Sequence, residues 1–371
     1  MMPGKKKIAY LRSSNVYSDS RATKEILCLL DAGYDVTVLS WDRDGKENDY
    51  FHSVFGDSVK RKSYEVRVSG NLGRKGIVKL VAFSLWCYKT LFTFSFDAVH
   101  ACDFDTGPVA AWYCKRKSCK FIYDIYDYYA DSHGVEGVLR RLLEKAENKV
   151  IDNADLTIIC TEERRDQIKK AKPRKVAIIY NSPEITKISD NEGILYDYVY
   201  CGSLYNGRLL KEIFDQYYNN TDLKLCIAGR GILEQEAAKC VCDHFTFLGS
   251  IPYSQVLKEE SRAIAISAIY EPTSRNNKLC APNKFYEAMA LSKPVIVCKG
   301  SGIDRIVKDQ GIGIVIDYNA AEFYHELRWL KDHPEDCKDM GRRGRALYDS
   351  KYAWSLMKER LTEEYRQLFS E

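Results

Sequence analysis

Short apolar runs alternate with longer amphipathic segments along nearly the whole chain. In the first half, the apolar runs occupy residues 8–11, 36–39, 98–101, 121–123 and 156–160. In the second half, they occupy residues 198–201, 223–228, 245–248, 263–267, 294–297 and 313–316. Short apolar runs separated by helical segments are typical of parallel strands that helices cover on both faces. The pattern therefore predicts two doubly wound, Rossmann-like α/β domains.

A polar segment over residues 181–193 separates the two sets of predicted strands. It contains a proline and a glycine and no apolar run, which is the composition of a linker. We expect an N-terminal domain over residues 1–182 and a C-terminal domain over residues 183–353. Residues 354–371 read as an amphipathic helix, which we expect to pack back on the N-terminal domain. A chain of 371 residues suits this division.

The composition excludes few classes of protein. Hydrophobic residues make up 45% and charged residues 29%, as in an ordinary globular protein. The formal net charge of +4 is too mild to suggest general nucleic-acid binding. The 13 cysteines form no zinc-type sets and many lie in predicted strands, which favours a reduced, intracellular protein. No signal-peptide core and no run of about 18 apolar residues is present, so we expect a cytoplasmic protein that does not span a membrane.

The segment APNKFYEAMALSKPVIV reads as a short helix that begins at Pro282 and ends before a buried strand. Lys284 lies in its first turn, where the helix dipole normally favours acidic residues. Backbone N–H groups around Asn283 and the charge of Lys284 would together bind an anion. Glu287 follows on the same helical face, so the pair suits the phosphate and the sugar hydroxyls of one nucleotide. The alternative is an exposed i,i+3 ion pair.

Two glycine-containing turns follow predicted strands in the second half. Gly202 and Ser203 come directly after one strand, and Arg208 precedes the next helix. Glycine lets the backbone approach a ligand closely, and an arginine can grip a diphosphate. Gly229 and Arg230 follow another strand in a Gly-x-Gly turn, which is a weaker signal. The alternative for both segments is an ordinary β–α turn.

Taken together, these segments resemble the retaining family-4 glycosyltransferases of the GT-B fold. The stretch PNKFYEAMA is similar to the signature Pro-Asn-Lys-x-x-Glu-x-Met-Ala of one subgroup. Further similarities occur at residues 18–25, 32–39, 96–103, 155–161 and 180–183. The resemblance implies two Rossmann-like domains that face a central cleft. It also implies that the C-terminal domain binds a nucleotide-diphosphate-sugar as co-substrate, without another cofactor, and that the N-terminal domain binds the acceptor.

The resemblance also implies roles for single residues. Glu287 contacts the ribose, because a carboxylate can accept from two hydroxyls. Arg208 and Lys284 hold the diphosphate, whose negative charge grows as the glycosidic bond breaks. Five further residues are expected to line the same donor pocket: Gly202, Ser203, Gly229, Arg230 and Asn283.

The C-terminal half departs from the family pattern at one position. The family's first glutamate, separated by seven residues from the one that corresponds to Glu287, would fall at Leu279, which offers no acceptor to the donor sugar. Glu271 lies upstream but out of register. Asn277 and Lys278 are nearby candidates for contact with the sugar.

The N-terminal half departs from the pattern at Tyr126, which stands where the family commonly has a histidine. Asp127 then becomes the best polar group to face the reacting carbon, and Asp103 the second, although either aspartate could instead cap a loop. Asp103 and Asp105 also form an Asp-x-Asp pair, which could hold a divalent metal against a diphosphate. We expect no metal, because that device belongs to the other nucleotide-sugar transferase fold, in which the second α/β half would have no role.

Two helical segments suggest a membrane surface as a partner. Residues 77–92 are unusually apolar and follow the basic stretch 73–76, and Arg140, Arg141 and Lys145 begin another amphipathic helix. Both segments could rest on an anionic membrane that carries a lipid-linked acceptor. The alternative is a core helix with a solvated basic end.

We therefore predict a retaining glycosyltransferase that acts on a lipid-linked or surface-polysaccharide precursor at the inner face of the membrane. The predicted catalytic residues are Asp127, Arg208 and Lys284, and the predicted acceptor-side residues are Asp103 and Tyr126. The departing diphosphate itself is expected to help take the acceptor proton during front-face attack. Two alternatives are a catalytically inactive nucleotide-sugar-binding subunit and a nucleotide-sugar epimerase of the same fold.

Overall fold

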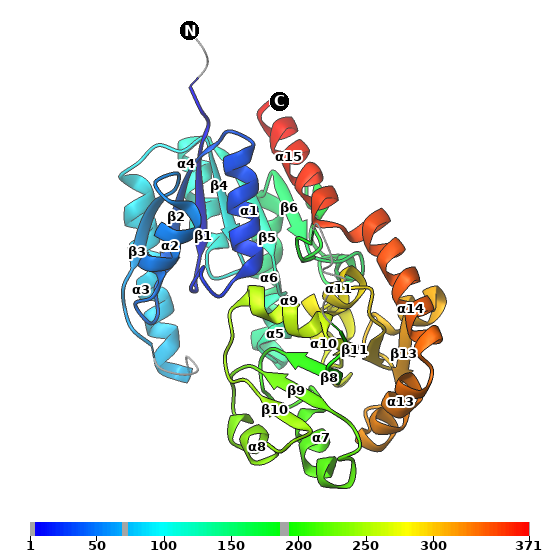
Figure 1. The fold of residues 1–371 in the computed structure, drawn as a ribbon. Helices are drawn as coiled ribbons and strands as arrows, with labels where there is room; N and C mark the ends of the chain where they lie inside the picture. The colour runs from blue at the N-terminus through cyan, green and yellow to red at the C-terminus, as the bar shows by residue number, and fades with distance from the viewer. Residues whose placement is uncertain (1–3, 69–72, 186–192, 371) are drawn as a thin grey trace. The chain divides into compact units, whose positions relative to one another are not determined.

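The computed structural model describes residues 4–68, 73–185 and 193–370. It divides the chain into two compact units (Figure 1). The first unit comprises Met1–Ile179 together with Met357–Glu371, and the second comprises Tyr180–Leu356. Of the predicted linker, residues 186–192 lie outside the described part of the chain.

The first unit contains a parallel sheet of seven strands in the order β3-β2-β1-β4-β5-β6-β7. The strands are β1 Lys7–Arg12, β2 Asp35–Trp41, β3 Lys60–Tyr64, β4 Ala98–Cys102, β5 Lys120–Ile125, β6 Leu156–Ile159 and β7 Val176–Ile178. The strand order reverses between β1 and β4, which makes the carboxyl ends of these strands the topological switch point of the sheet.

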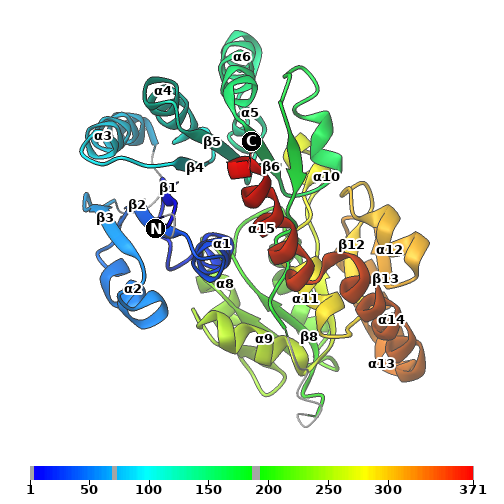
Figure 2. The same ribbon diagram turned by 90° about the horizontal axis from the view of Figure 1, so that it is seen from above.

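Helices cover both faces of this first sheet. They are α1 Ser20–Asp31, α2 Glu47–Phe55, α3 Gly73–Phe92, α4 Gly107–Lys117, α5 Tyr129–Ser132 and α6 Gly137–Asn153. Figure 2 shows α3, α4 and α6 along one face of the sheet and α1 and α2 along the other. The carboxylate of Asp19 caps α1 by accepting from the Ala22 N–H at 3.0 Å.

The last helix, α15 Trp354–Ser370, enters the first unit at Met357. Thr362 Oγ1 lies 3.4 Å from Cys28 Sγ on α1, and Tyr365 Oη lies 2.7 Å from His100 Nδ1 on β4. The end of the chain therefore packs on the unit that its beginning forms.

The second unit contains a parallel sheet of six strands in the order β10-β9-β8-β11-β12-β13. The strands are β8 Tyr196–Cys201, β9 Leu225–Ala228, β10 Phe245–Phe247, β11 Ala263–Ala268, β12 Val295–Cys298 and β13 Gly313–Ile316. The helices are α7 Leu210–Gln216, α8 Glu234–Lys239, α9 Tyr253–Ser261, α10 Arg275–Leu279, α11 Asn283–Ala290, α12 Asp304–Gln310, α13 Ala320–Asp332 and α14 Pro334–Leu347. The switch point lies between β8 and β11.

The predicted fold class of two doubly wound parallel sheets is confirmed. The pattern of apolar runs identified every strand of the second sheet and the five central strands of the first, and it missed β3 and β7. Both missed strands lie at sheet edges, and β3 has the polar sequence KRKSY. Strand β3 is partly solvated, so it lacks the continuous apolar run that marks a strand covered on both faces. Strand β7 was missed although its three residues, VAI, are all apolar.

Among the described residues, no helix is both long enough and apolar enough to cross a membrane. Helix α3 buries Phe83, Cys87 and Leu91 and exposes the apolar side chains of Val78 and Leu85. The predicted basic stretch 73–76 forms the start of this helix, and the side chains of Arg74 and Lys75 lie outside the described part of the structure.

Candidate functional site

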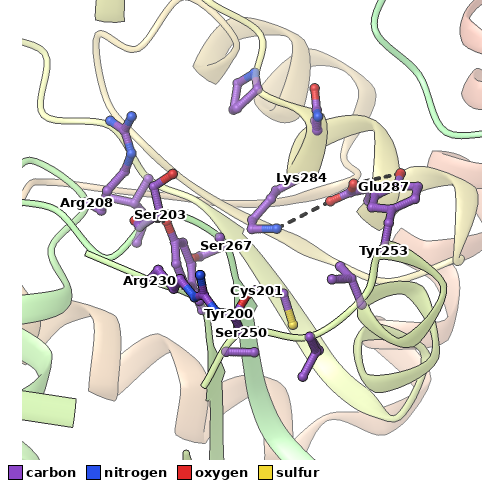
Figure 3. A pocket seen from close by; sticks show the side chains of 18 of the residues that line it. Tyr200, Cys201, Ser203, Arg208, Arg230, Ser250, Tyr253, Ser267, Lys284 and Glu287 are labelled. Carbon is purple, nitrogen blue, oxygen red and sulfur yellow. Dashed lines mark hydrogen bonds and ion pairs between the residues drawn. The ribbon is translucent and has the colours of Figure 1, made fainter. Parts of the chain in front are cut away.

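The second unit contains a cavity of about 510 Å³ at the switch point of its sheet (Figure 3). This volume is typical of small-molecule sites. The walls come from the carboxyl ends of β8, β9 and β11 and from the start of α11. The structure brings every predicted donor-binding residue to this cavity: Gly202, Ser203, Arg208, Gly229, Arg230, Asn283, Lys284 and Glu287.

Two glycine turns form the floor of the cavity because they approach each other closely. The Gly202 N–H donates to the Ala228 carbonyl at 2.9 Å. Gly229 has a φ of +146°, and a Cβ at this position would lie 1.7 Å from the Gly202 carbonyl oxygen. No side chain can be accommodated there, so the Gly-x-Gly turn is required by packing. The turn also leaves backbone exposed to whatever fills the cavity.

Helix α11 presents its first turn to the cavity. Pro282 has extended backbone angles and occupies the N-cap position, one residue earlier than the predicted first helical position, and the helix begins at Asn283. Asn283 Oδ1 accepts from Asn181 Nδ2 at 2.7 Å, which fixes the amide at the helix start. Lys284 and Glu287 follow on the face that lines the cavity.

Lys284 lies between two carboxylates. Its Nζ atom is 3.0 Å from Glu260 Oε1. It is 3.4 Å from Glu287 Oε2, the contact drawn in Figure 3. The ion pair between Lys284 and Glu287 is thus largely buried, because Glu260 and Tyr253 on α9 contact it. The alternative of an exposed ion pair is therefore wrong. Burial alone would lower the pKa of Lys284, but Glu260 and Glu287 outweigh it and hold that pKa well above its ordinary value.

Tyr253 is a second contribution of α9 to the site. Its hydroxyl donates to Glu287 Oε1 at 3.0 Å, so each oxygen of the Glu287 carboxylate has a partner. Neither Tyr253 nor Glu260 was identified from the sequence. Glu260 lies within the polar run KEES, which looks like the solvated end of a helix. Only the packing of α9 beside β8 turns these two side chains toward α11.

Arg208 has a different environment from Lys284. Its guanidinium carbon lies 3.4 Å from the centroid of the Tyr270 ring, a cation–π contact. No carboxylate in the described part of the chain lies within ion-pairing distance of Arg208, although the residue lines the same cavity as Lys284. Among the described residues, the site therefore contains one cation that is paired with two acids and one that lies over an aromatic ring and pairs with no acid.

The residues considered for contact with the donor sugar lie outside the wall of the cavity. Leu279 ends α10, and Glu271, Asn277 and Lys278 do not line the cavity either. Asn277 instead donates from Nδ2 to the Glu271 carbonyl at 2.8 Å, and the Glu271 N–H donates to the Gly207 carbonyl at 3.0 Å. These contacts shape the loop that precedes α11.

The predicted acceptor-side residues lie at the carboxyl edge of the first sheet. Asp103 follows β4 with a left-handed φ of 62°, and its Oδ1 accepts from the Tyr126 N–H at 2.9 Å. Its Oδ2 pairs with Arg12, whose guanidinium also stacks on the Tyr126 ring. Asp103 is thus a loop-fixing residue. Asp127 is half exposed, and its Oδ1 lies 2.8 Å from Arg164 Nη2.

The two acids of the Asp-x-Asp pair have separate partners. Asp103 pairs with Arg12, and Asp105 accepts from the Ser13 hydroxyl at 2.8 Å. In the described residues, the one group of three potential metal-ligating side chains that come together is His100, Cys102 and Asp124, and it does not include this pair.

A fully buried charged cluster underlies this edge of the first sheet. Arg21 of α1 pairs with Asp124 of β5 at 2.7 Å and with Glu25 at 3.0 Å. Burial raises the pKa of Glu25 to about 7 and that of Asp124 to about 6. It lowers the pKa of His100 to about 4. The cluster ties α1 to the centre of the sheet, and none of its members was identified from the sequence.

Comparisons with protein-family models and with solved structures indicate the same class of protein. The family model described as Glycosyltransferase Family 4 matches residues 23–184, and the model described as Glycosyl transferases group 1 matches residues 205–347. The two sheets with their helices match solved GT-B structures, which confirms the predicted GT-B fold. The chain therefore carries both domains of a GT-B glycosyltransferase and belongs to this class of enzymes.

Solved structures of similar proteins extend over nearly the whole chain. Sucrose-phosphate synthase from Thermosynechococcus elongatus has a TM-score of 0.74 at 16% identity and covers 99% of this chain and 100% of its own. Anabaena HepE, in complex with UDP-glucose, has a TM-score of 0.69 at 14% identity, with 97% and 99% covered. A glycosyltransferase from Rickettsia africae has a TM-score of 0.67 at 12% identity, with 99% of both chains covered. A search of curated proteins finds no match.

Proposed function

We propose that the protein is a retaining glycosyltransferase that moves a sugar from a nucleotide-diphosphate-sugar to an acceptor hydroxyl. The observation that carries the proposal is the pair of cations on one cavity of the second unit, of which Arg208 has no acid partner among the described residues. A leaving diphosphate needs such charge as the glycosidic bond breaks. The complexes of HepE with UDP and UDP-glucose support a nucleotide donor for this fold.

The proposed role of each residue follows from its contacts in the structure. Arg208 and Lys284 stabilise the departing diphosphate, which in turn helps take the acceptor proton. Glu287, held between Tyr253 and Lys284, accepts from the ribose hydroxyls. Backbone at Gly202 and Gly229 lines the floor of the cavity, and at Gly229 only glycine fits. Asp127 orients the acceptor or the donor from the first unit.

The donor can be identified by a thermal-shift screen with UDP, GDP and dTDP and their sugars. A ligand that binds only the folded protein raises the unfolding temperature by mass action. We expect one of these nucleotides to give a shift that inorganic phosphate does not. Absence of a shift with every nucleotide would end the proposal.

The transfer reaction is then tested with the donor so identified. We expect transfer to continue in EDTA, because Arg208 and Lys284 are proposed to supply the charge that a divalent ion would supply otherwise. Loss of transfer in EDTA with recovery in Mn²⁺ would contradict this expectation and would favour a metal site at Asp103 and Asp105.

For the acceptor, we propose a lipid-linked or surface-polysaccharide precursor at the cytoplasmic face of a membrane. The start of α6 exposes Val138, Leu139 and Leu142 next to the basic residues Arg141 and Lys145. An exposed apolar face flanked by cations suits an anionic lipid surface. Cosedimentation with anionic vesicles should fall when these three apolar residues are changed to serine, and should not fall when the exposed apolar residues Ile232 and Val241 are changed instead.

A catalytically inactive nucleotide-sugar-binding subunit is the second candidate. Two observations favour it: Leu279 replaces the first glutamate of the family and Tyr126 replaces its histidine. Such a protein would bind the donor and release no nucleotide in the presence of any acceptor, whereas the proposed enzyme releases nucleotide as it transfers the sugar.

A further inference from the structure

Glu260 is a fully buried acid directly behind the cavity wall. Its Oε1 is 3.0 Å from Lys284 Nζ, and its Oε2 is buried without a hydrogen-bond partner among the described residues. A carboxylate oxygen that is neither hydrated nor hydrogen-bonded is costly while it carries negative charge. The residue does not line the cavity itself, so any effect on a ligand must pass through Lys284.

Lys284 and its two acids set the local charge of the site. Glu287 Oε2 lies 3.4 Å from the same ammonium that Glu260 contacts. If both acids were ionised, the three groups together would carry a net negative charge where a diphosphate is proposed to bind. A proton on one acid removes that charge and leaves the ammonium balanced by a single carboxylate.

The surroundings of Glu260 favour the proton on this acid. Burial, followed by the neighbouring Glu287, raises the pKa of Glu260 to about 8, against the opposing effect of Lys284. The other titratable groups near it are Tyr253 on α9 and Cys201 on β8, and burial raises the pKa of both. The pKa of Lys284 is also held well above its ordinary value.

We propose that Glu260 is a positioning residue that carries a proton at neutral pH and, by losing it in mild alkali, weakens the hold of Lys284 on the nucleotide diphosphate. The inference rests on the proposed function of this cavity. Beyond that function, the inference assigns a role to a residue that does not touch the nucleotide, and it predicts that nucleotide binding depends on pH. Diphosphate binding in turn favours the protonated acid, since the ligand adds negative charge beside it.

The test is titration calorimetry of UDP, GDP and dTDP with the full chain between pH 7 and pH 9, where the terminal phosphate is already ionised. For the nucleotide that binds, the wild-type Kd should rise about tenfold over this range, as expected for one proton with a pKa near 8. Glu260→Gln, which keeps a neutral side chain of the same shape, should bind with a Kd that does not vary with pH. Glu259→Gln is the matched control, because Glu259 contacts Arg262 instead of Lys284, and it should keep the wild-type rise.

Proton uptake gives a second measurement that needs no variant. Wild-type binding at pH 8.5, measured in buffers of different ionisation enthalpy, should take up a fraction of a proton. A Kd that does not vary with pH together with zero uptake would overturn the proposal, as would a Glu260→Gln protein with the wild-type rise. Binding of none of the three nucleotides at any pH would instead overturn the proposed function of the cavity.

Discussion

Both units place cations near the switch points of their sheets, but these cations differ in whether acids pair with them. In the first unit, Arg12 pairs with Asp19 and Asp103, and Arg21 pairs with Glu25 and Asp124. In the second unit Lys284 also has two acids, whereas Arg208 lies over the Tyr270 ring. A cation whose charge is fully matched by ionised acids holds the fold together. A cation that lacks an acid, as Arg208 does among the described residues, is available to a ligand, and so is Lys284 if Glu260 carries a proton as proposed above. Four predictions test this contrast.

Removing a matched cation should have the largest effect, and the effect should be on stability. Arg21→Ala leaves Glu25 and Asp124 buried without their cation, which we expect to cost about 4 kcal/mol in the free energy of unfolding. Urea unfolding followed by circular dichroism measures this loss, and nucleotide affinity should stay unchanged in the folded protein. Lys6→Ala, which removes an exposed pair with Asp97, is the control and should cost less than about 1 kcal/mol. Equal stability of the two variants would contradict the assignment of Arg21 to the fold.

Removing the cation that lacks an acid should have the next largest effect, and this effect should be on function. Arg208→Ala should lower kcat/KM and nucleotide-diphosphate affinity about 100-fold while leaving the unfolding curve in place. Arg208→Lys keeps the charge but loses the planar stack on Tyr270. Its kcat/KM and its nucleotide-diphosphate affinity should therefore lie between those of the wild type and of Arg208→Ala. Arg342→Ala on α14, an exposed arginine paired with Asp339, is the control and should behave as wild type. Wild-type kinetics in Arg208→Ala would show that this cation has no part in the reaction.

The cations of the cavity could be predicted from the sequence, whereas the buried cation Arg21 of the first unit could not. Lys284 was identified because it lies in a segment similar to a known signature, and Arg208 because it lies in a glycine-containing segment that follows a strand. Arg21 was not identified, because its acid partner Asp124 is about a hundred residues away on strand β5, and sequence spacing cannot show such a pair. Glu260 was missed for the same reason, since α9 and α11 meet only in the folded unit. By contrast, strands buried on both faces could be predicted from the sequence, because the apolar run that marks each of them is local.

The third prediction concerns the pH dependence of stability and a buried acid, Glu147, that pairs with no cation in the described part of the chain. Glu147 of α6 accepts from the Tyr123 hydroxyl at 3.0 Å and from the Tyr129 N–H at 3.2 Å, and burial raises its pKa to about 8. In the unfolded chain a glutamate releases its proton near pH 4.3, so between that pH and 8 the folded state binds more protons than the unfolded state. The free energy of unfolding should therefore fall as pH rises through this window, and between about pH 6 and pH 8 the fall should be on the order of 2 kcal/mol.

Glu147→Gln separates this contribution from the rest of the protein. The amide keeps an acceptor for Tyr123 and cannot ionise, so the variant should lose that part of the pH dependence and be the more stable protein at pH 8. Glu136→Gln, at an exposed position before α6, should keep the wild-type dependence. Parallel curves for Glu147→Gln and wild type would show that Glu147 is ionised throughout.

The smallest predicted effect tests whether Glu287 binds the ribose or the diphosphate of the nucleotide. Tyr253→Phe removes the hydroxyl that donates to Glu287 Oε1 at 3.0 Å, which should weaken nucleotide binding about fivefold, or about 1 kcal/mol. Because Glu287 is proposed to hold the ribose, the loss should be the same for a nucleoside and for its diphosphate in calorimetry. Arg208→Ala should instead weaken only the diphosphate. Tyr218→Phe, an exposed tyrosine that donates to the Lys239 carbonyl, is the control. A loss in Tyr253→Phe that is confined to the diphosphate would place Glu287 with the phosphate-binding cations instead of with the ribose.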